Sequence, residues 1–281
     1  AETSVTEDGE GLRLQGIGFG QMTTGRRGRV AGLIGRWSFR RVTQALDSFP
    51  RVYGLAKNLA DDLSADLTFD VWRQAVSLAL LQDHWAAHQL HPTTFALIGE
   101  GYGFLGALIR RAIPEARIYY IDLPKILVFQ ADTHRKADPE AKMTLLQNGV
   151  DEICFVLPHQ IEQISDTIDC AINIASMGEM TETSIASYFE FLRRRSGPGS
   201  RFYCANRASK ELPGGEVTEF SSYPWLAEDR VYLEGDCPYL SHYWSPETLT
   251  DGPRIGGLRV PFLNYFDGEF VQRLVHLSPV E

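Results

Sequence analysis

Short apolar runs alternate with longer amphipathic stretches in the central part of the chain, from Thr93 to Asn206. The apolar runs have the length and the Ile, Phe and Tyr content of buried strands. They lie at 95–98, 118–121, 153–157, 170–175 and 202–205. The stretches with helical periodicity lie at 104–111, 125–136 and 183–195. Strands that alternate with helices predict a parallel sheet covered by helices on both faces.

The N-terminal part of the chain has a different pattern. Residues 29–90 are helical in pattern, with Leu78 and Trp85 spaced as on one buried face. Residues 1–28 are rich in Gly, Thr, Glu and Arg and show no periodicity. We expect a flexible arm there, either disordered or closing over a site. Residues 1–90 are therefore predicted to form this arm and a helical lid.

The C-terminal part loses the regular alternation. Residues 206–257 are rich in Pro, Gly and aromatic residues, and we expect an insertion there that binds the substrate. Two strand-like runs follow at 258–263 and 270–277, joined by a segment that contains Asp267-Gly268, a hairpin signal. Pro261 weakens the first run or places it at a sheet edge. An antiparallel hairpin closing an α/β sheet departs from a plain dinucleotide-binding sheet.

Composition narrows the class of protein. The chain has 281 residues, of which 44% are apolar, which suits one large α/β domain with an appendage or two small domains. A net charge of -9 argues against a broad phosphate-binding surface and hence against nucleic acid as a partner. No apolar run approaches the roughly 20 residues that span a bilayer, and the N-terminus lacks a signal-peptide core. We expect a cytoplasmic protein without a membrane partner; whether it forms a homo-oligomer stays open.

Metal-ligand and disulfide patterns are weak. His84 and His88 are four residues apart, which places them on one helical face, but no HExxH pattern accompanies them. Polar helix surface or a pocket wall is the favoured interpretation of this pair. The four cysteines form no CxxC pair. Cys154, Cys170 and Cys204 each lie in an apolar, strand-like run, so we expect buried thiols rather than disulfides.

The most informative motif is a glycine-rich turn between the first predicted strand and the helix after it. It reads Gly99-x-Gly101-x-Gly103-x-x-Gly106. Such a turn lets the backbone approach a ligand closely and aims helix N–H groups at it. Asp122 lies 21 residues after Gly101 and ends the second predicted strand, where an acid can hold ribose hydroxyls. The motif indicates an adenosine-containing cofactor; GxGxxG alone favours NAD as much as any other.

Three segments, taken in order, resemble a known family. They are the loop 99–103 (GEGYG), the turn 122–124 (DLP) and the segment 172–180 (INIASMGEM) after the fourth predicted strand. Together they resemble the sugar O-methyltransferase family, class I methyltransferases that use S-adenosylmethionine (SAM). The additional Gly99 and the terminal hairpin fit this resemblance better than they fit NAD proteins. The resemblance covers about 93–206, and it implies a Rossmann-like class I methyltransferase domain, α/β and mostly parallel, over residues 91–281.

The resemblance also implies which residues bind SAM. The glycine loop passes under the methionine and ribose, Asp122 holds the ribose hydroxyls, and the adenine packs after the third strand. The implied cofactor-binding residues are Gly99, Gly101, Tyr102, Gly103, Asp122, Leu123, Leu157, Gln160, Asn173 and Ser176. One position departs from the class I pattern, because Leu97 stands where an acid usually precedes the loop. Glu100 either compensates from inside the turn or points to solvent.

The implied reaction is methyl transfer from SAM to a hydroxyl of a sugar or a glycosylated small molecule. The protein must align acceptor, methyl and sulfur, and a general base assists because a sugar hydroxyl is a weak nucleophile. No metal is strictly needed. Glu179 is the first candidate base, since it follows the fourth strand in the segment that faces the acceptor in related enzymes. His242, in an aromatic stretch suited to a sugar, is the second, and Asp236 is the third.

Two other functions stay open at the level of sequence. A catalytically inactive, methyltransferase-like binding protein is supported by Leu97. An NAD-dependent oxidoreductase would use the same GxGxxG, with a Tyr-x-x-x-Lys pair after it. Tyr53 and Lys57 form such a pair, but they precede the loop and lie in the helical segment. A small-molecule acceptor is therefore the partner that the sequence favours.

Overall fold

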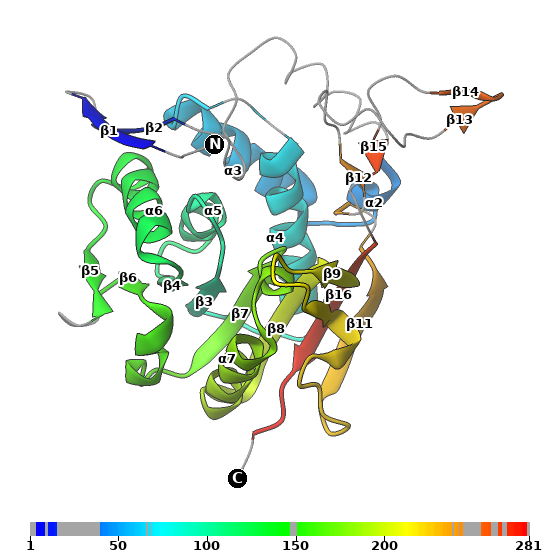
Figure 1. The fold of residues 1–281 in the computed structure, drawn as a ribbon. Coiled ribbons are helices and arrows are strands. Elements are labelled where there is room, and N and C mark those ends of the chain that lie inside the picture. Colours follow the sequence, from blue (N-terminus) through cyan, green and yellow to red (C-terminus); the bar gives the residue numbers. More distant parts are fainter. Residues whose placement is uncertain are drawn as a thin grey trace.

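The molecule is built on one eight-stranded sheet with the order β11-β16-β8-β7-β3-β4-β6-β5 (Figure 1). The computed structural model describes residues 4–8, 11–15, 40–65, 67, 69–146, 151–237, 239–240, 242–243, 254–259, 264–265 and 269–279. The parallel strands are β3 (Thr94–Ile98), β4 (Arg117–Ile121), β5 (Met143–Leu145), β6 (Ile153–Val156), β7 (Ile168–Ile174) and β8 (Ser196–Arg207). β16 (Phe270–His276) pairs antiparallel with β8 and with the edge strand β11 (Arg230–Asp236). The predicted Rossmann-like, mostly parallel sheet with an antiparallel C-terminal end is confirmed.

Helices cover both faces of this sheet because side chains alternate along each buried strand. Phe95 and Leu97 of β3 face a core shared with the N-terminal helices, α5 and α6, whereas Ala96 and Ile98 face a second core shared with α7. The first layer contains α3 (Phe49–Asp62), α4 (Phe69–Ala87), α5 (Phe104–Ala112) and α6 (Pro124–Ala137). The second contains η2 (Pro158–Gln163), α7 (Glu182–Arg194) and η4 (Phe220–Ser222). In Figure 1, α3 to α6 lie above the sheet and α7 lies below it.

The N-terminal segment divides into more elements than its pattern predicts. α2 (Arg40–Gln44) precedes α3 and α4, and β1 (Ser4–Asp8) and β2 (Gly11–Gln15) form an antiparallel pair within the predicted arm. Leu78 and Trp85 are buried as their spacing predicts. The four cysteines are all buried and unpaired, as expected for three of them. Among the described residues, no helix is both long and apolar enough to cross a membrane.

The predicted C-terminal hairpin is wrong in one of its two strands. β16 matches the second run, but its antiparallel partner is β11, which lies inside the predicted insertion 206–257. The first run contributes β14 (Leu258–Arg259), which pairs with β13 (Arg254–Ile255). The sequence pattern did not predict β11, because β11 is an edge strand with exposed residues at most positions and therefore has no strand-length apolar run.

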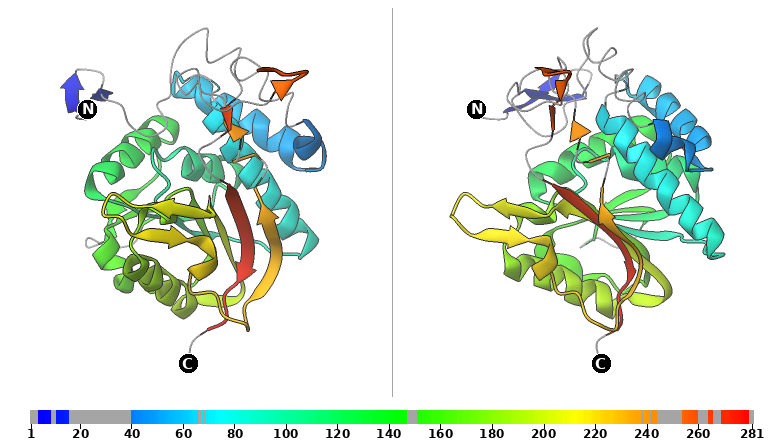
Figure 2. Two further views of the ribbon diagram at one scale, coloured as in Figure 1. Left: turned by 45° about the vertical axis from the view of Figure 1, so that its right-hand side comes forward. Right: turned by 90° about the vertical axis from the view of Figure 1, so that its right-hand side faces the viewer.

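The remaining described elements lie beside the carboxyl ends of the parallel strands (Figure 2). They are η3 (Met177–Glu179), β9 (Ser209–Glu211), β10 (Val217–Glu219), β12 (His242–Tyr243) and β15 (Asn264–Tyr265). β9 and β10 form a hairpin directly after β8, and β12 pairs with β15. Figure 2 shows the β9–β10 hairpin projecting from the sheet near η3.

Candidate functional site

The glycine loop joins β3 to α5 at the carboxyl edge of the sheet. Gly99, Gly101 and Gly103 have φ values of +63°, +86° and +86°, which L-residues with side chains rarely adopt. Gly99 N–H donates to the carbonyl of Ile121 (3.0 Å) and so extends the ladder between β3 and β4. The loop therefore starts from a fixed point, and its glycines are required by the backbone conformation.

The space around each glycine distinguishes two roles for the glycines of the loop. A Cβ would overlap the Ser176 side chain at Gly99, the backbone of Gln130 at Gly103 (2.9 Å to Cα) and the Tyr120 hydroxyl at Gly106. At Gly101, by contrast, no described atom lies within 4 Å of an added Cβ. Three glycines thus allow close packing within the protein, whereas Gly101 borders open space where a ligand can approach the backbone.

Glu100 is partly buried, and its carboxylate faces the start of α5. Its carboxylate accepts hydrogen bonds from the backbone N–H groups of Gly103 (2.6 Å) and Leu105 (2.7 Å), at the N-terminus of α5. Burial raises the pKa of Glu100 to about 8, although these two hydrogen bonds oppose the shift. Leu97, at the position of the usual acid, is fully buried in the core. Of the two alternatives for Glu100, the structure supports compensation: the acid orients the loop from within.

Asp122 ends β4 beside the glycine loop. Its carboxylate accepts the N–H of Leu123 (2.8 Å), the N–H of Gly101 and the side-chain amide of Gln130 (2.9 Å). Burial raises its pKa, and these hydrogen bonds lower it. A carboxylate has about four lone-pair sites, so these contacts leave room for one hydroxyl. Leu123 next to it is 62% exposed and offers an apolar surface at the same edge.

One face of α6 holds the loop in place. Thr133 Oγ1 donates to the carbonyl of Tyr102 (2.6 Å). Tyr120 Oη donates to the carbonyl of Gly103 (3.0 Å) and also contacts His134 Nε2 (2.5 Å). Because the single hydroxyl proton serves Gly103, His134 is the donor to Tyr120; burial lowers the pKa of His134 to about 4 and keeps it neutral.

The sequence contains a pattern that indicates this buried polar face of α6, although the residues were not predicted to belong to the site. Gln130, Thr133 and His134 are spaced i, i+3 and i+4, and all three are buried. Polar residues on the buried face of an amphipathic helix require partners inside the protein. Gln130 binds Asp122, Thr133 binds the glycine loop, and His134 binds the Tyr120 hydroxyl, which itself donates to the loop, so α6 positions both parts of the candidate site.

A network of amides fixes the turn after β7. Asn173 donates to the carbonyl of Ile98 (2.8 Å) and to Ser176 Oγ (2.6 Å). Its oxygen accepts from Asn206 (2.7 Å) and from the N–H of Met177 (3.3 Å). These bonds use the donors and acceptors of a fully buried Asn173, so its side chain supports the loop, and the predicted cofactor contact at Asn173 stays a prediction. Asn206, at the end of β8, was not predicted.

The remaining predicted cofactor residues lie along the same edge. Ser176 Oγ donates to the carbonyl of Ile98 (3.1 Å) and packs against Gly99. The partly buried Tyr102 ring lies 5.9 Å from that of Phe129 on α6. Leu157 follows β6 and is partly buried. Gln160 folds back so that its side-chain oxygen accepts the N–H of Leu157 (3.0 Å), which orders the turn.

The three candidate bases are spread along the edge. Glu179 lies in η3, directly after β7, and is ion-paired with Lys210 of the β9–β10 hairpin. Asp236 ends β11 and is exposed, four strands from β3, or about 19 Å at the usual strand spacing. His242 lies in β12, and its side chain is outside the described part of the structure. Glu179 is thus the candidate that the structure brings nearest to the loop in sheet order.

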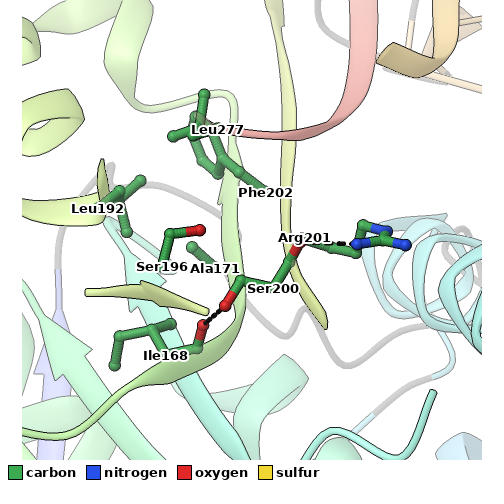
Figure 3. A pocket seen from close by; sticks show the side chains of 8 residues that line it. All are labelled: Ile168, Ala171, Leu192, Ser196, Ser200, Arg201, Phe202 and Leu277. Carbon is green, nitrogen blue, oxygen red and sulfur yellow. Dashed lines mark hydrogen bonds between the residues drawn. The ribbon is translucent and has the colours of Figure 1, made fainter. Parts of the chain in front are cut away.

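A small hollow lies at the opposite end of the sheet (Figure 3). It is lined by residues of β7 and β8, among them Ile168 and Ser200, by Leu192 of α7 and by Leu277, which follows β16. Ser200 Oγ donates to the carbonyl of Ile168 there (2.6 Å). Ligands of open α/β sheets bind outside the carboxyl ends of the strands, so this hollow is not the cofactor site.

Comparisons with known proteins find similarity only among solved structures. Neither the protein-family models nor the curated proteins match this chain. Among solved structures, it is similar to a SAM-dependent methyltransferase from Clostridium acetobutylicum (TM-score 0.44, 11% identity, 70% of this chain and 89% of that one). It is also similar to the pyocyanin biosynthetic protein PhzM (0.39, 14%, 74% and 57%) and to the mitomycin 7-O-methyltransferase MmcR (0.40, 15%, 73% and 56%). The chain thus spans little more than half the length of PhzM and MmcR, and at these identities the likeness is to the fold alone.

Proposed function

We propose that the chain is a SAM-dependent O-methyltransferase that acts on a hydroxyl of a sugar or a glycosylated small molecule. The observation that carries this proposal is the open space above Gly101, bordered by Asp122 and by the exposed side chain of Leu123. A nucleoside needs these three elements: a backbone without a side chain, an acceptor for ribose hydroxyls, and an apolar contact for the base.

In this proposal Asp122 binds a ribose hydroxyl, Leu123 contacts the adenine, and Gly101 lies under the sugar. When bound, SAM supplies an activated methyl group on a sulfonium. The protein then has to hold the acceptor hydroxyl in line with it and exclude water, which supplies much of the rate. Glu179 takes the hydroxyl proton at its carboxylate, and Lys210 holds that carboxylate at the end of β7.

The first experiment asks which cofactor stabilises the fold. Thermal unfolding is measured with SAM, S-adenosylhomocysteine (SAH), NAD or NADP, since a ligand that binds the native state raises the unfolding temperature. We expect a shift with SAM and SAH and none with the dinucleotides. Asp122→Asn should reduce the SAH shift, because the amide offers one acceptor oxygen in place of two. A shift with NAD alone would refute the proposal.

The second experiment separates an enzyme from a binding protein. The ion pair between Glu179 and Lys210 gives the inactive alternative some support, because Lys210 occupies the carboxylate that would have to take the proton. Transfer of a radiolabelled methyl group from SAM is measured with a panel of free sugars, glycosides and the matching aglycones. Transfer to glycosides but not to aglycones supports the acceptor class. SAH binding without transfer to any of them favours the binding protein.

A further inference from the structure

Basic side chains gather at the amino ends of the parallel strands, at the opposite end of the sheet from the glycine loop. They come from the last turn of α4 and the residue after it, the middle of β8, the start of β11 and the end of β16. This basic cluster consists of His84, His88, Arg201, Arg230 and His276. In a chain with a net charge of -9, such a concentration of basic groups needs a physical reason.

Tyr232 of β11 lies at the centre of the basic cluster. The guanidinium carbon of Arg201 is 4.1 Å from its ring centroid, and that of Arg230 is 5.0 Å away. The ring centroids of His84 and His88 lie 4.9 and 5.1 Å from the same ring, and 4.1 Å from each other. In the register of β11 and β16, Arg230 is opposite His276. The basic groups are thus near neighbours around one aromatic ring.

Arg201 is the most unusual member, because it is only 6% exposed and yet pairs with no acid in the described part of the chain. Its donors reach the carbonyls of Gly199 (3.2 Å) and Ser200 (2.9 Å) and His84 Nε2 (3.0 Å), all of them neutral groups. Figure 3 shows its side chain pointing away from the hollow. Among the described residues, no carboxylate forms an ion pair with Arg201 or Arg230. Buried charges are normally paired, so the basic cluster lacks its counter-charge.

The carboxylates near the basic cluster bind other groups. Asp83, beside His84 in sequence, accepts the N–H of Ser48 (2.9 Å). Asp169, one residue before the β7 partner of Arg201, accepts the N–H groups of Thr93 and Thr94. Asp229, beside Arg230, is held in a buried ion pair with Arg193. None of these acids neutralises the basic cluster.

We propose that the basic cluster is a binding site for a phosphate group, held by Arg201, Arg230 and His88. The planar fork of the Arg230 guanidinium matches the oxygens of a phosphate. Arg201 adds its positive charge and its Nη2 donors, since Nε and Nη1 already donate within the protein, and the His88 imidazole adds a third donor. His84 and His88 cannot coordinate a metal ion together through His84 Nε2, because this nitrogen accepts a hydrogen bond from the Arg201 guanidinium. Burial, His88 and Arg201 lower the pKa of His84 to about 4, as expected where positive charge is uncompensated.

Calorimetric titration tests this site with inorganic phosphate and with glucose 6-phosphate, at constant ionic strength and with chloride as the blank. These probes separate free phosphate from a phosphate ester: tighter binding of one identifies the source, and saturable binding of either supports the site. Arg230→Gln and His88→Gln change exposed residues, so folding is not at risk. Arg41→Gln, at an exposed arginine of α2, removes the same charge outside the basic cluster.

We expect about a tenfold loss of phosphate affinity in Arg230→Gln and a similar loss in His88→Gln, since each removes a hydrogen bond to a charged group. Arg41→Gln should bind as the unmodified protein does. The proposal is overturned if the unmodified protein shows no saturable heat with either probe. It is equally overturned if Arg41→Gln weakens binding as much as Arg230→Gln, because net charge alone then explains the effect. Neither result depends on SAM binding.

Discussion

Replacing Gly101 by alanine isolates the space that the cofactor is proposed to occupy. Gly101 and Gly103 have the same φ of +86°, so an alanine at either position has the same backbone strain. They differ in surroundings: the added Cβ meets open space at Gly101 and the backbone of Gln130, 2.9 Å away, at Gly103. Gly215, in the turn between β9 and β10, has a φ of +84° and open space as well, and it serves as a control away from the loop.

The magnitudes follow from these geometries. A left-handed conformation costs a residue with a Cβ about 1–2 kcal/mol, which is the expected loss of stability in Gly101→Ala and Gly215→Ala. Gly103→Ala adds overpacking of about 1–3 kcal/mol against a backbone that cannot move aside. Only at Gly101 does the methyl group enter the proposed ligand space. There we expect SAH affinity to fall about tenfold or more, equivalent to at least about 1.4 kcal/mol.

Two measurements on the same four proteins test this reasoning. Urea unfolding gives the free energy of unfolding, and calorimetric titration with SAH gives the dissociation constant under conditions where each variant is folded. Gly101→Ala and Gly215→Ala should lose similar stability, but only the first should lose affinity. If Gly101→Ala binds SAH within twofold of the unmodified protein, the space above Gly101 does not belong to the cofactor.

Four further predictions follow from the contacts. Because burial raises the folded pKa of Glu100 to about 8 from its ordinary 4.5, the unfolded state loses this proton first, and the contribution of Glu100 to stability should fall by about 3 kcal/mol from pH 5 to pH 8. The lowered pKa values of His84 and His134 act in the opposite direction in this range, so the quantity to compare is the difference in unfolding free energy between the unmodified protein and Glu100→Gln at each pH. Urea unfolding should show that difference falling by about 3 kcal/mol between pH 5 and pH 8, and a constant difference contradicts the assignment. Arg193→Met leaves the Asp229 carboxylate buried without its ion-pair partner and should lower the free energy of unfolding in urea by about 3–5 kcal/mol. A loss below about 1 kcal/mol would contradict this expectation. Thr133→Val should weaken SAH binding about fivefold in titration calorimetry, whereas Thr133→Ser should not, since only the valine removes the hydrogen bond to the loop. Equal SAH affinities of the two variants would limit this bond to a role in folding. Glu179→Gln should lower kcat about 10²–10⁴-fold in the methyl-transfer assay without altering SAH affinity, and full turnover would remove it as the base.

The parallel half of the fold was predictable because its strands are buried on both faces. Runs such as 95–98 and 118–121 then appear as continuous apolar segments, and the glycine loop must follow the first of them. β11 was missed for the opposite reason, since an edge strand with exposed residues has no apolar signature. Pairing over long sequence separations, such as β11 with β16, depends on tertiary packing that a local pattern does not contain.

The candidate site was predictable in position more than in detail. Motif order placed Gly101 and Asp122 at one sheet edge, but it did not distinguish residues that face a ligand from residues that support the loop. Asn173 shows the difference, because its role depends on the amide of Asn206, 33 positions later. The orientation of Glu100 likewise depends on N–H groups that become available only when α5 forms.

The arrangement along the sheet edge has a consequence for how new specificities arise. In the proposed function, Gly101 after β3 and Asp122 after β4 contact the cofactor and α6 supports them, whereas Glu179 and the β9–β10 hairpin follow β7 and β8. The hairpin is tied to η3 by the ion pair of Lys210 and by the hydrogen bond from Thr218 Oγ1 to the carbonyl of Met180 (3.3 Å). Its turn can therefore vary in length and composition while the glycine loop and Asp122 stay intact. Under the proposed function, acceptor preference and cofactor use are then separable traits, and exchange of the hairpin turn is the smallest modification that would alter one and spare the other.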